Sequence, residues 1–219
     1  MSKDLAIYGA GGFGKEVACL INRINARIDE RQERWNLIGF FDDSKPVGSA
    51  VSRYGMVLGG LEELQHVDKP LAIAIAINEN KVVRRIRESL SNPLISFPTL
   101  IDPTLFLVDE ITFEIGEGNI IQNNCMISCD VRIGSFNLIN DHVVVGHDNC
   151  IGDYNGLMPG THLSGSIVIG NNNLLGVASV VLQGLTIGDG VTLGANSVLV
   201  SQPRDNCTYL GVPAKKFDF

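Results

Sequence analysis

The chain has 219 residues, 45% of them hydrophobic, and a formal net charge of −7. This length suits one large domain or two modest ones, and the acidic balance argues against nucleic acid as a partner. No apolar stretch is long enough to span a membrane, and Asp4 interrupts the first apolar run, which does not fit a secretory signal. The five cysteines are scattered and odd in number, as is typical of reduced thiols in a cytosol. The sequence therefore predicts a cytoplasmic protein without membrane insertion.

Residues 4 to about 97 alternate short apolar runs with helical patterns. A strand over residues 5–8 precedes a helix over about 15–27, and a second strand covers residues 37–41. A strand end and a short helix follow over residues 58–64. A third apolar run covers residues 71–77, and a last helix covers residues 81–90. This βαβ order with buried apolar strands predicts a small parallel sheet.

A glycine-rich turn separates the first strand from the first helix. Residues 9–14 fit G-x-G-x-x-G in the strand–turn–helix context that binds nucleotide phosphates, although a tight turn without a ligand is the alternative. Two acidic residues end the second strand and a polar group ends the third run, at the sheet edge where ligands bind. The candidate ligand contacts are Gly11, Gly12, Phe13, Asp42, Asp43 and Asn80.

From Ile115 to Leu199, every sixth residue is Ile, Leu or Val, at fifteen positions without a slip of register. A period of six fits neither a helix nor an ordinary strand, and it indicates a parallel β-helix. Three repeats per coil would make five coils, a prism of roughly 24 Å at the usual strand spacing. Gly follows the aliphatic residue at eight positions, as tight turns require.

Taken in order, several segments of the chain resemble the bacterial sugar O-acyltransferase family. They are residues 7–14, Gly39-Phe40-Phe41-Asp42-Asp43, Val145-Gly146-His147-Asp148, residues 187–198 and Gly211-Val212-Pro213-Ala214-Lys215. That family includes sialic-acid O-acetyltransferases and UDP-4-amino-sugar N-acetyltransferases, and the resemblance covers nearly the whole chain.

The resemblance implies two domains. The first is an α/β Rossmann-like domain over residues 1–98 that binds the nucleotide-sugar acceptor. The second, over residues 99–219, is a left-handed β-helix acetyltransferase domain with a C-terminal CoA-binding tail. It further implies a homotrimer that acts in polysaccharide biosynthesis, takes acetyl-CoA as cosubstrate and uses no metal.

Two histidines of the repeat region could act as the base. His147 matches the general base of the family, and Asp148 matches the acidic neighbour that orients it. A neutral imidazole suits direct attack on the thioester at neutral pH. His142, beside Asp141, is the rival base, and we rank it second as a residue that lines the acceptor pocket.

The resemblance also implies the donor contacts. Gly165 matches the position whose backbone N–H holds the thioester carbonyl oxygen, while Val177 and Ala195 match positions that pair with the pantetheine arm. Pro213 and Lys215 belong to the tail that would cover the adenine end and its phosphates. Plain turns and a solvated terminus fit the same residues from the sequence alone.

Two departures from the family bear on the acceptor. Relatives that act on UDP-4-amino sugars often have His where this chain has Phe13, and a second His where it has Gly156. These departures weaken the N-acetyl interpretation relative to the O-acetyl one.

Three other functions stay open. The glycine motif alone would suit an NAD-dependent oxidoreductase. The spacing of His142 and His147 would suit a γ-carbonic-anhydrase-like metal hydratase, although no third His lies upstream in the repeats. A β-helix kept only for assembly would be a scaffold without acetyl-CoA binding.

Overall fold

The computed structural model describes residues 2–27 and 34–218, and the chain divides into two compact units. The first unit ends at Pro103 and the second begins at Thr104, so the boundary falls later than the residue 98 suggested by the sequence. Residues after 98 still contact the first unit: buried Asp102 forms an ion pair of 2.6 Å with Arg23. Among the described residues, no helix combines the length and the apolar character needed to cross a bilayer.

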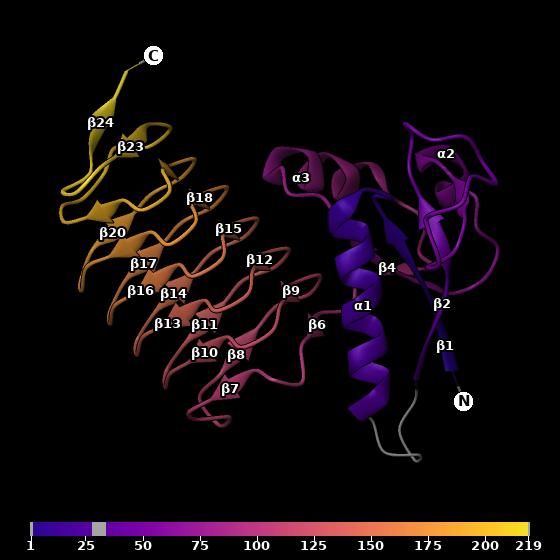
Figure 1. Cartoon of the computed structure of the whole chain (residues 1–219), viewed down its shortest axis with the longest axis horizontal. Coiled ribbons are helices and arrows are strands. Elements are labelled where there is room, and N and C mark those ends of the chain that lie inside the picture. Colours follow the sequence, from indigo (N-terminus) through magenta and orange to yellow (C-terminus); the bar gives the residue numbers. More distant parts are fainter. Residues whose placement is uncertain (1, 28–33, 219) are drawn as a thin grey trace. The chain divides into compact units, whose positions relative to one another are not determined.

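The first unit is a parallel α/β sheet with the strand order β3-β2-β1-β4-β5 (Figure 1). Its core contains Leu5, Ile7, Phe40 and Ile73, all inaccessible to solvent. In chain order the elements are β1 (Ser2–Tyr8), α1 (Gly12–Arg27), β2 (Arg34–Phe41), β3 (Val57–Gly59), α2 (Leu61–Gln65), β4 (Leu71–Ile75), α3 (Asn80–Ser89), β5 (Ile95–Ser96) and β6 (Leu100–Ile101). The predicted parallel sheet is confirmed.

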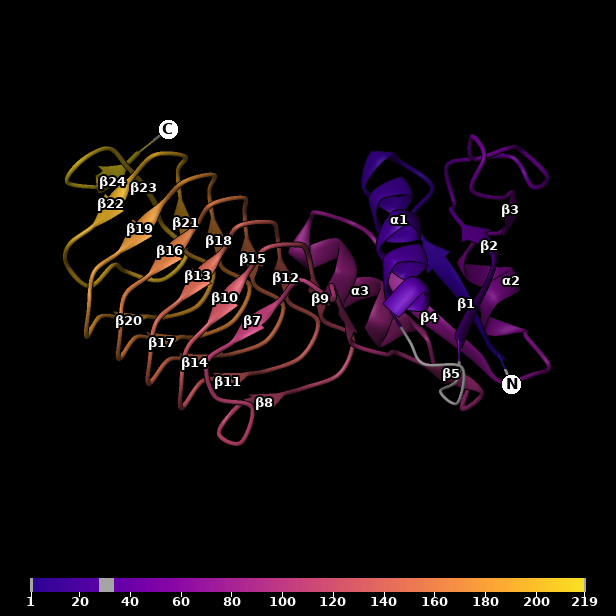
Figure 2. The same ribbon diagram turned by 60° about the horizontal axis from the view of Figure 1, so that its bottom comes forward.

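The second unit is a parallel β-helix whose coil strands, β7 to β22, have two residues each (Figure 2). Neighbouring coils pair residues that lie 18 positions apart, as in Met126 with Val144. The strands are β7 (Phe106–Leu107), β8 (Glu114–Ile115), β9 (Ile120–Ile121), β10 (Met126–Ile127), β11 (Arg132–Ile133), β12 (Leu138–Ile139), β13 (Val144–Val145), β14 (Cys150–Ile151), β15 (Gly156–Leu157), β16 (His162–Leu163), β17 (Val168–Ile169), β18 (Leu174–Leu175), β19 (Val180–Val181), β20 (Thr186–Ile187), β21 (Thr192–Leu193), β22 (Val198–Leu199), β23 (Thr208–Leu210) and β24 (Lys215–Phe217).

The aliphatic repeat points into the prism as expected. Of the fifteen repeat positions, fourteen are buried, and the exception is Ile115 in the first coil. The hexapeptide period did not predict β6 or β7, which precede its start at Ile115, and the residues between β7 and β8 are two more than the repeat allows. As a result Leu107 pairs with Ile127 at a separation of 20 residues. The period also did not predict the antiparallel pairing of β23 with β24, which closes the C-terminal end.

Each coil turns three corners, which we name by the strands that they follow. Corner A follows β10, β13, β16 and β19 and holds Cys129, His147, Gly165 and Gln183. Corner B follows β11, β14, β17 and β20 and holds Ser135, Asp153, Asn171 and Asp189. Corner C follows β12, β15, β18 and β21 and holds Asp141, Pro159, Val177 and Ala195.

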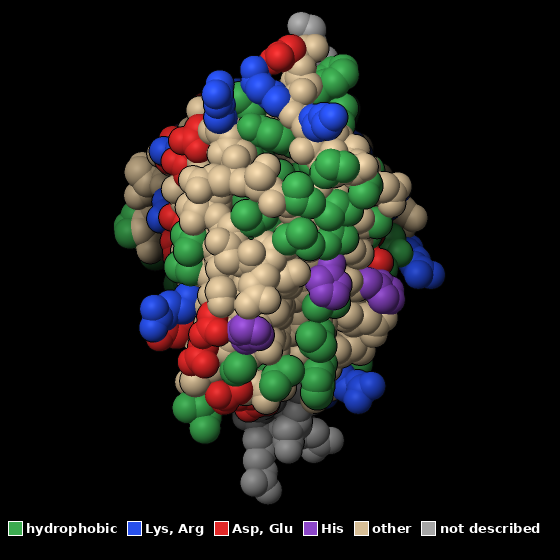
Figure 3. All heavy atoms as spheres, turned by 90° about the vertical axis from the view of Figure 1, so that its left-hand side faces the viewer, with side chains coloured by type: hydrophobic (Ala, Val, Ile, Leu, Met, Phe, Trp, Pro, Cys, Tyr) green, Lys and Arg blue, Asp and Glu red, His purple; other side chains and the backbone are tan. Residues whose placement is uncertain are grey.

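A ladder of buried asparagines runs up the inside of corner B. Asn119, Asn137, Asn155 and Asn173 stack 18 residues apart, and each side-chain oxygen accepts a hydrogen bond from the residue one coil above. Burying an amide is costly unless its polar atoms are paired, and here the ladder pairs them with the turns. On the outer surface of the β-helix, hydrophobic side chains lie next to histidine side chains (Figure 3).

Candidate functional site

A cavity of about 500 Å³ opens at the carboxyl edge of the first unit's sheet. Its walls include Tyr8 at the end of β1, Asp42 after β2 and Ala76 after β4. The chain continues from β1 to β2 and β3 on one side of β1 and then crosses to β4 on its other side, so the cavity lies at the topological switch point of the sheet. Ligands of open α/β sheets bind at such a point.

The four glycines of the turn divide into two classes. A Cβ on Gly14 would lie 2.0 Å from the Gly9 carbonyl oxygen, and Gly9 itself has a φ of +110°. These two glycines are therefore required by the turn. A Cβ on Gly11 or Gly12 would meet nothing within 4 Å, because both face the cavity that Phe13 also lines.

Asp42 is held by the protein's own donors. Its carboxylate accepts hydrogen bonds from the Ala10 backbone N–H at 2.8 Å and from the backbone N–H and hydroxyl of Ser44 at 2.9 and 2.6 Å. Burial acts to raise the pKa of Asp42, but these hydrogen bonds and nearby Lys45 together lower it. Asp42 thus ties the glycine turn to the end of β2, a role that the sequence did not reveal.

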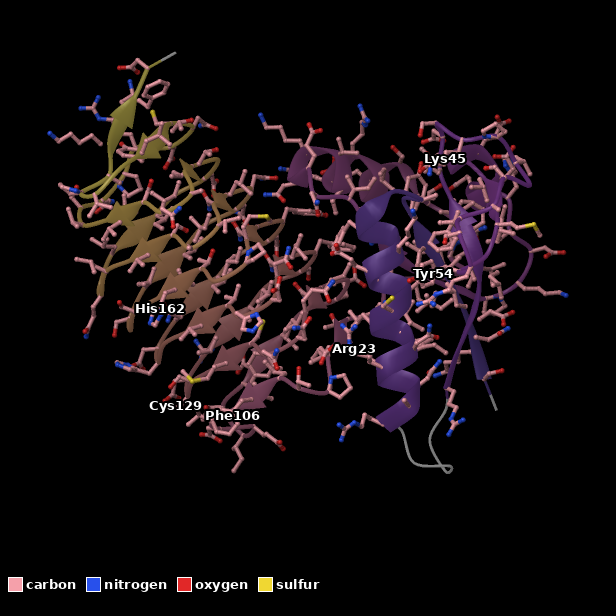
Figure 4. All side chains as sticks on the ribbon, viewed as in Figure 1. Arg23, Lys45, Tyr54, Phe106, Cys129 and His162 are labelled. Carbon is pink, nitrogen blue, oxygen red and sulfur yellow. The ribbon has the colours of Figure 1, made fainter. Side chains whose placement is uncertain are left out.

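Asp43 is engaged in the same way. It accepts hydrogen bonds from the Tyr8 hydroxyl and, at 2.8 Å, from the Leu61 backbone N–H. Burial, and then the bond to Asp43, raise the pKa of Tyr8 well above its ordinary range. The Lys45 ammonium, on the loop after β2 (Figure 4), donates to the Ala10 carbonyl oxygen.

The remaining cavity wall comes from α3 and the residues before it. Asn78 and Arg85 line the cavity, whereas Asn80 begins α3 and is not among the lining residues. Arg85 is a cavity residue that was not predicted, because no motif marks it on the helix pattern of residues 81–90.

His147 and Asp148 stand together on corner A. Asp148 adopts a φ of +56°, which Asp tolerates, and its carboxylate lies 2.7 Å from the Nδ1 of His147. A carboxylate at Nδ1 holds the proton on that nitrogen and leaves Nε2 as the acceptor. The His147 side chain is 50% exposed, so Nε2 is accessible.

His142 is less available as a base. Its Nδ1 lies 3.1 Å from Asp141, and its Nε2 lies 3.4 Å from the side-chain nitrogen of Asn124. An amide donor at Nε2 occupies the lone pair that would accept a proton. No comparable donor to the Nε2 of His147 exists among residues 2–27 and 34–218.

Gly165 lies in the next coil, directly beside the His147 ring. A Cβ on residue 165 would lie 2.5 Å from both Cε1 and Nε2 of His147. Only a glycine therefore leaves room for the imidazole in this position. The backbone of Gly165 and the proton-accepting nitrogen of His147 border the same small space.

The backbone N–H groups differ between corners. On corner B, a side-chain oxygen from the coil above accepts from the N–H of Ser135, Asp153 and Asn171 at 2.6 to 2.8 Å. On the other corners, the N–H groups of Gly165, Val177 and Ala195 have no acceptor within the described part of the chain. These three donors are free to bind a ligand.

The predicted tail residues lie at the C-terminal end of the β-helix. Pro213 is exposed and follows Val212 through a cis peptide bond, and Lys215 begins β24, also exposed. Across the described residues, no three side chains of His, Cys, Asp or Glu come together as metal ligands.

Two segments of the chain match known protein families. Residues 4–90 match the PglD N-terminal domain family, and residues 166–201 match the bacterial transferase hexapeptide family over six repeats. No curated protein matches the chain.

Three similar solved structures cover nearly the whole chain. The acetyltransferase domain of PglB from Neisseria gonorrhoeae, in complex with acetyl coenzyme A, is 28% identical with a TM-score of 0.87, covering 99% of this chain and 100% of that one. WeeI from Acinetobacter baumannii is 27% identical with a TM-score of 0.85, covering 99% and 100%. A mutant of perosamine N-acetyltransferase from Caulobacter crescentus, in complex with CoA and GDP-perosamine, is 26% identical with a TM-score of 0.81, covering 99% and 97%.

These similarities extend over both units of the chain. The chain thus joins an α/β unit that matches the PglD N-terminal domain family over residues 4–90 to a β-helix that matches the bacterial transferase hexapeptide family over residues 166–201.

Proposed function

We propose that this protein transfers the acetyl group of acetyl-CoA to the amino group of a nucleotide-linked amino sugar, with His147 as the general base. The observation that carries the proposal is the pairing of His147 with Gly165. A base with an accessible Nε2 lies beside a backbone N–H that has no protein acceptor.

The chemistry follows from these two groups. The acceptor amine attacks the thioester carbonyl carbon, a C–N bond forms, and the C–S bond breaks to release CoA. The Nε2 of His147 takes the proton that the amine loses, Asp148 stabilises the resulting imidazolium, and the imidazolium then returns the proton to the departing CoA thiolate. The Gly165 N–H donates to the carbonyl oxygen as negative charge develops on it.

Acetyl-CoA would lie along corners A and C of the β-helix, where backbone N–H groups have no acceptor in the part of the chain that the structure describes. The N–H groups of Val177 and Ala195 would pair with the amides of the pantetheine arm, and Pro213 and Lys215 would cover the nucleotide end of CoA, with Lys215 as a charge for its phosphates. The similar structures that contain acetyl coenzyme A or CoA support this choice of donor.

The acceptor's nucleotide would bind in the cavity of the first unit. The open positions at Gly11 and Gly12 and the start of α1 suit a diphosphate, and Arg85 adds a positive charge to the wall. Asp42 and Asp43 shape this cavity through the turn and loop that they hold. The similar structure that contains GDP-perosamine supports a nucleotide sugar as the ligand.

The protein would act as a homotrimer. The outer face of the sheet β22-β19-β16-β13-β10-β7 carries exposed apolar side chains between corners C and A, including Phe106, Val108, Leu182 and Val200. Phe106 and His162 lie on strands of this sheet (Figure 4). An exposed apolar patch suits a subunit interface, and backbone N–H groups that lack an acceptor among the described residues lie on the two corners that flank it.

Nitrogen, and not oxygen, is the acetylated atom in this proposal. The perosamine N-acetyltransferase supports nitrogen, whereas Phe13 and Gly156, where amino-sugar enzymes often carry His, favour oxygen. The test is a thiol-release assay with acetyl-CoA and pairs of nucleotide sugars that differ only in an amino or a hydroxyl group at one carbon. We expect thiol release and a product heavier by one acetyl group with the amino member. Thiol release with the hydroxyl member alone would show that oxygen, and not nitrogen, is acetylated. No thiol release with any pair would overturn the proposed function.

A further inference from the structure

Asn149 is a buried amide directly behind the proposed catalytic turn. Its side chain lies inside the prism, and the residue is 1% exposed although it follows exposed His147 and Asp148. Its side-chain nitrogen donates to the carbonyl oxygen of Gly146 at 2.7 Å and to that of Ser164 at 2.8 Å. Its side-chain oxygen accepts from the Ile167 backbone N–H at 2.9 Å.

These three bonds join two turns that lie in successive coils. Gly146 immediately precedes His147, and Ser164 immediately precedes Gly165. Asn149 thus fixes the backbone of both turns from the inside, at the residues next to the imidazole and the free N–H.

The residues stacked directly above and below Asn149 in the neighbouring coils do not have amide side chains. One coil below, its place is taken by Val131, and one coil above by Ile167, and both of these residues are fully buried. An aliphatic side chain therefore fills this part of the prism adequately. At corner B the same bonds repeat in coil after coil, as when Asn119 donates to the carbonyl oxygens of Gly116 and Gly134. At corner A this arrangement is confined, within the described coils, to the coil of His147.

We infer that Asn149 is a positioning residue, which sets the spacing and orientation of the His147 turn relative to the Gly165 turn. The inference rests on the proposed function for its catalytic consequence, but its structural content concerns only the two turns. Because reacting groups must be held in place closely, a small displacement between base and N–H donor can reduce the rate strongly.

The test replaces Asn149 by the residue of its neighbouring coil, Asn149→Val. Asn155→Val is the matched control, since Asn155 is equally buried and its side chain donates to Asn137 and to the Gly170 carbonyl oxygen, but at corner B. Asn149→Thr is the conservative variant. At corner C, the Thr161 hydroxyl donates to the Met158 carbonyl oxygen at 2.7 Å, so a threonine can make this type of bond.

Two measurements are made on each folded protein. The first is the NMR resonance of the His147 ring, assigned by its loss in His147→Ala, which requires no turnover. The second is kcat and the KM of each substrate. For Asn149→Val we expect a shifted or broadened His147 resonance and a kcat lower by about 10–100-fold, with a KM for the acceptor that changes little. Asn149→Thr should recover part of both effects, and Asn155→Val should leave the resonance unchanged even if it lowers thermal stability as much.

The outcomes separate this inference from the proposed function. If Asn149→Val leaves the His147 resonance and kcat as in the wild type, Asn149 has no positioning role, whatever His147→Ala does. The same holds if Asn155→Val moves the resonance equally, because the effect would then be general destabilisation. If the wild type transfers no acetyl group, the proposed function fails, and the resonance still decides whether Asn149 holds the turn.

Discussion

The ring of His147 packs against the α-carbon of Gly165 in the next coil, so closely that a Cβ there would lie 2.5 Å from Nε2. Two residues 18 positions apart in the chain therefore form one small site, which depends on one of them having no side chain.

Removing the imidazole should remove most of the catalysis. We expect His147→Ala to lower kcat by on the order of 10²–10⁴, the usual contribution of a general base, while the Kd for acetyl-CoA stays near the wild-type value. Thermal unfolding should barely change because the ring is half exposed. Asp148→Asn should cost less, since it orients the ring without taking the proton. The control is His142→Ala; if that variant alone lost activity, the base would be His142.

A methyl group on residue 165 should act through His147. In Gly165→Ala the ring must leave its place, so kcat should fall on the order of 10²-fold. Activity is measured in both single variants and in the double variant His147→Ala/Gly165→Ala. The two losses should be strongly non-additive, because the second change removes a ring that is already displaced. Additive losses would mean that Gly165 and His147 act independently.

The glycine turn should separate acceptor binding from folding. Gly12→Val places a side chain in the open cavity, so the KM for the acceptor should rise on the order of tenfold, a change of about 1.4 kcal/mol, with acetyl-CoA binding unchanged. The comparison is Gly14→Ala, whose Cβ would lie 2.0 Å from the Gly9 carbonyl oxygen, and which should lower the unfolding temperature instead. Equal loss of both ligands in Gly12→Val would indicate a folding role for this position.

Asp42 should make stability depend on pH. Its pKa is lowered in the folded protein, where burial is outweighed by the hydrogen bonds from Ser44 and Ala10. The unfolded chain therefore binds this proton more readily, and the stability that Asp42 contributes at neutral pH is lost as the pH falls through the lowered pKa. The free energy of unfolding, measured against pH, should differ most between wild type and Asp42→Asn at neutral pH, and the difference should shrink below about pH 4. A difference that is constant with pH would contradict this role; exposed Asp68→Asn serves as the comparison.

The apolar face of the β-helix should hold the subunits together. Light scattering of the wild type should give about three times 23.6 kDa. The double variant Leu182→Lys/Val200→Lys should be monomeric, because charges do not pack in an apolar interface. Val168→Lys changes an equally exposed apolar side chain on another sheet and should stay trimeric. A wild type that binds acetyl-CoA fully as a monomer would contradict the assembly.

The sequence predicted the β-helix well because each repeat carries its own signal. An inward aliphatic residue recurs every six positions, and a turn glycine follows it at eight of the fifteen, so the pattern survives the positions without glycine. Strand β7 escaped detection because two extra residues separate it from β8. In the first unit, the strand–turn–helix context of Gly9 to Gly14 was sufficient to predict where a cavity lies.

The partners of individual polar side chains could not be predicted in the same way. Asp42 and Asp43 were expected to contact a ligand, and both line the cavity, but the backbone donors from distant segments that also engage them could not be predicted. The difference between Asn149 and the corner B asparagines depends on which coil and corner each residue occupies. That only becomes visible once the repeats are wound three to a coil.

The corners also constrain how the length of such a protein can change. Because the strands of neighbouring coils from β8 to β22 pair residues 18 positions apart, adding or deleting three repeats lengthens or shortens the prism and keeps each residue on its corner. A change of one repeat would rotate everything beyond it by one corner. If six residues were lost between His147 and Gly165, the glycine would no longer stack on the histidine, although every inward aliphatic residue would still point inward. The inward aliphatic pattern is kept by steps of six, whereas the pairing of His147 with Gly165 requires their separation of 18 positions.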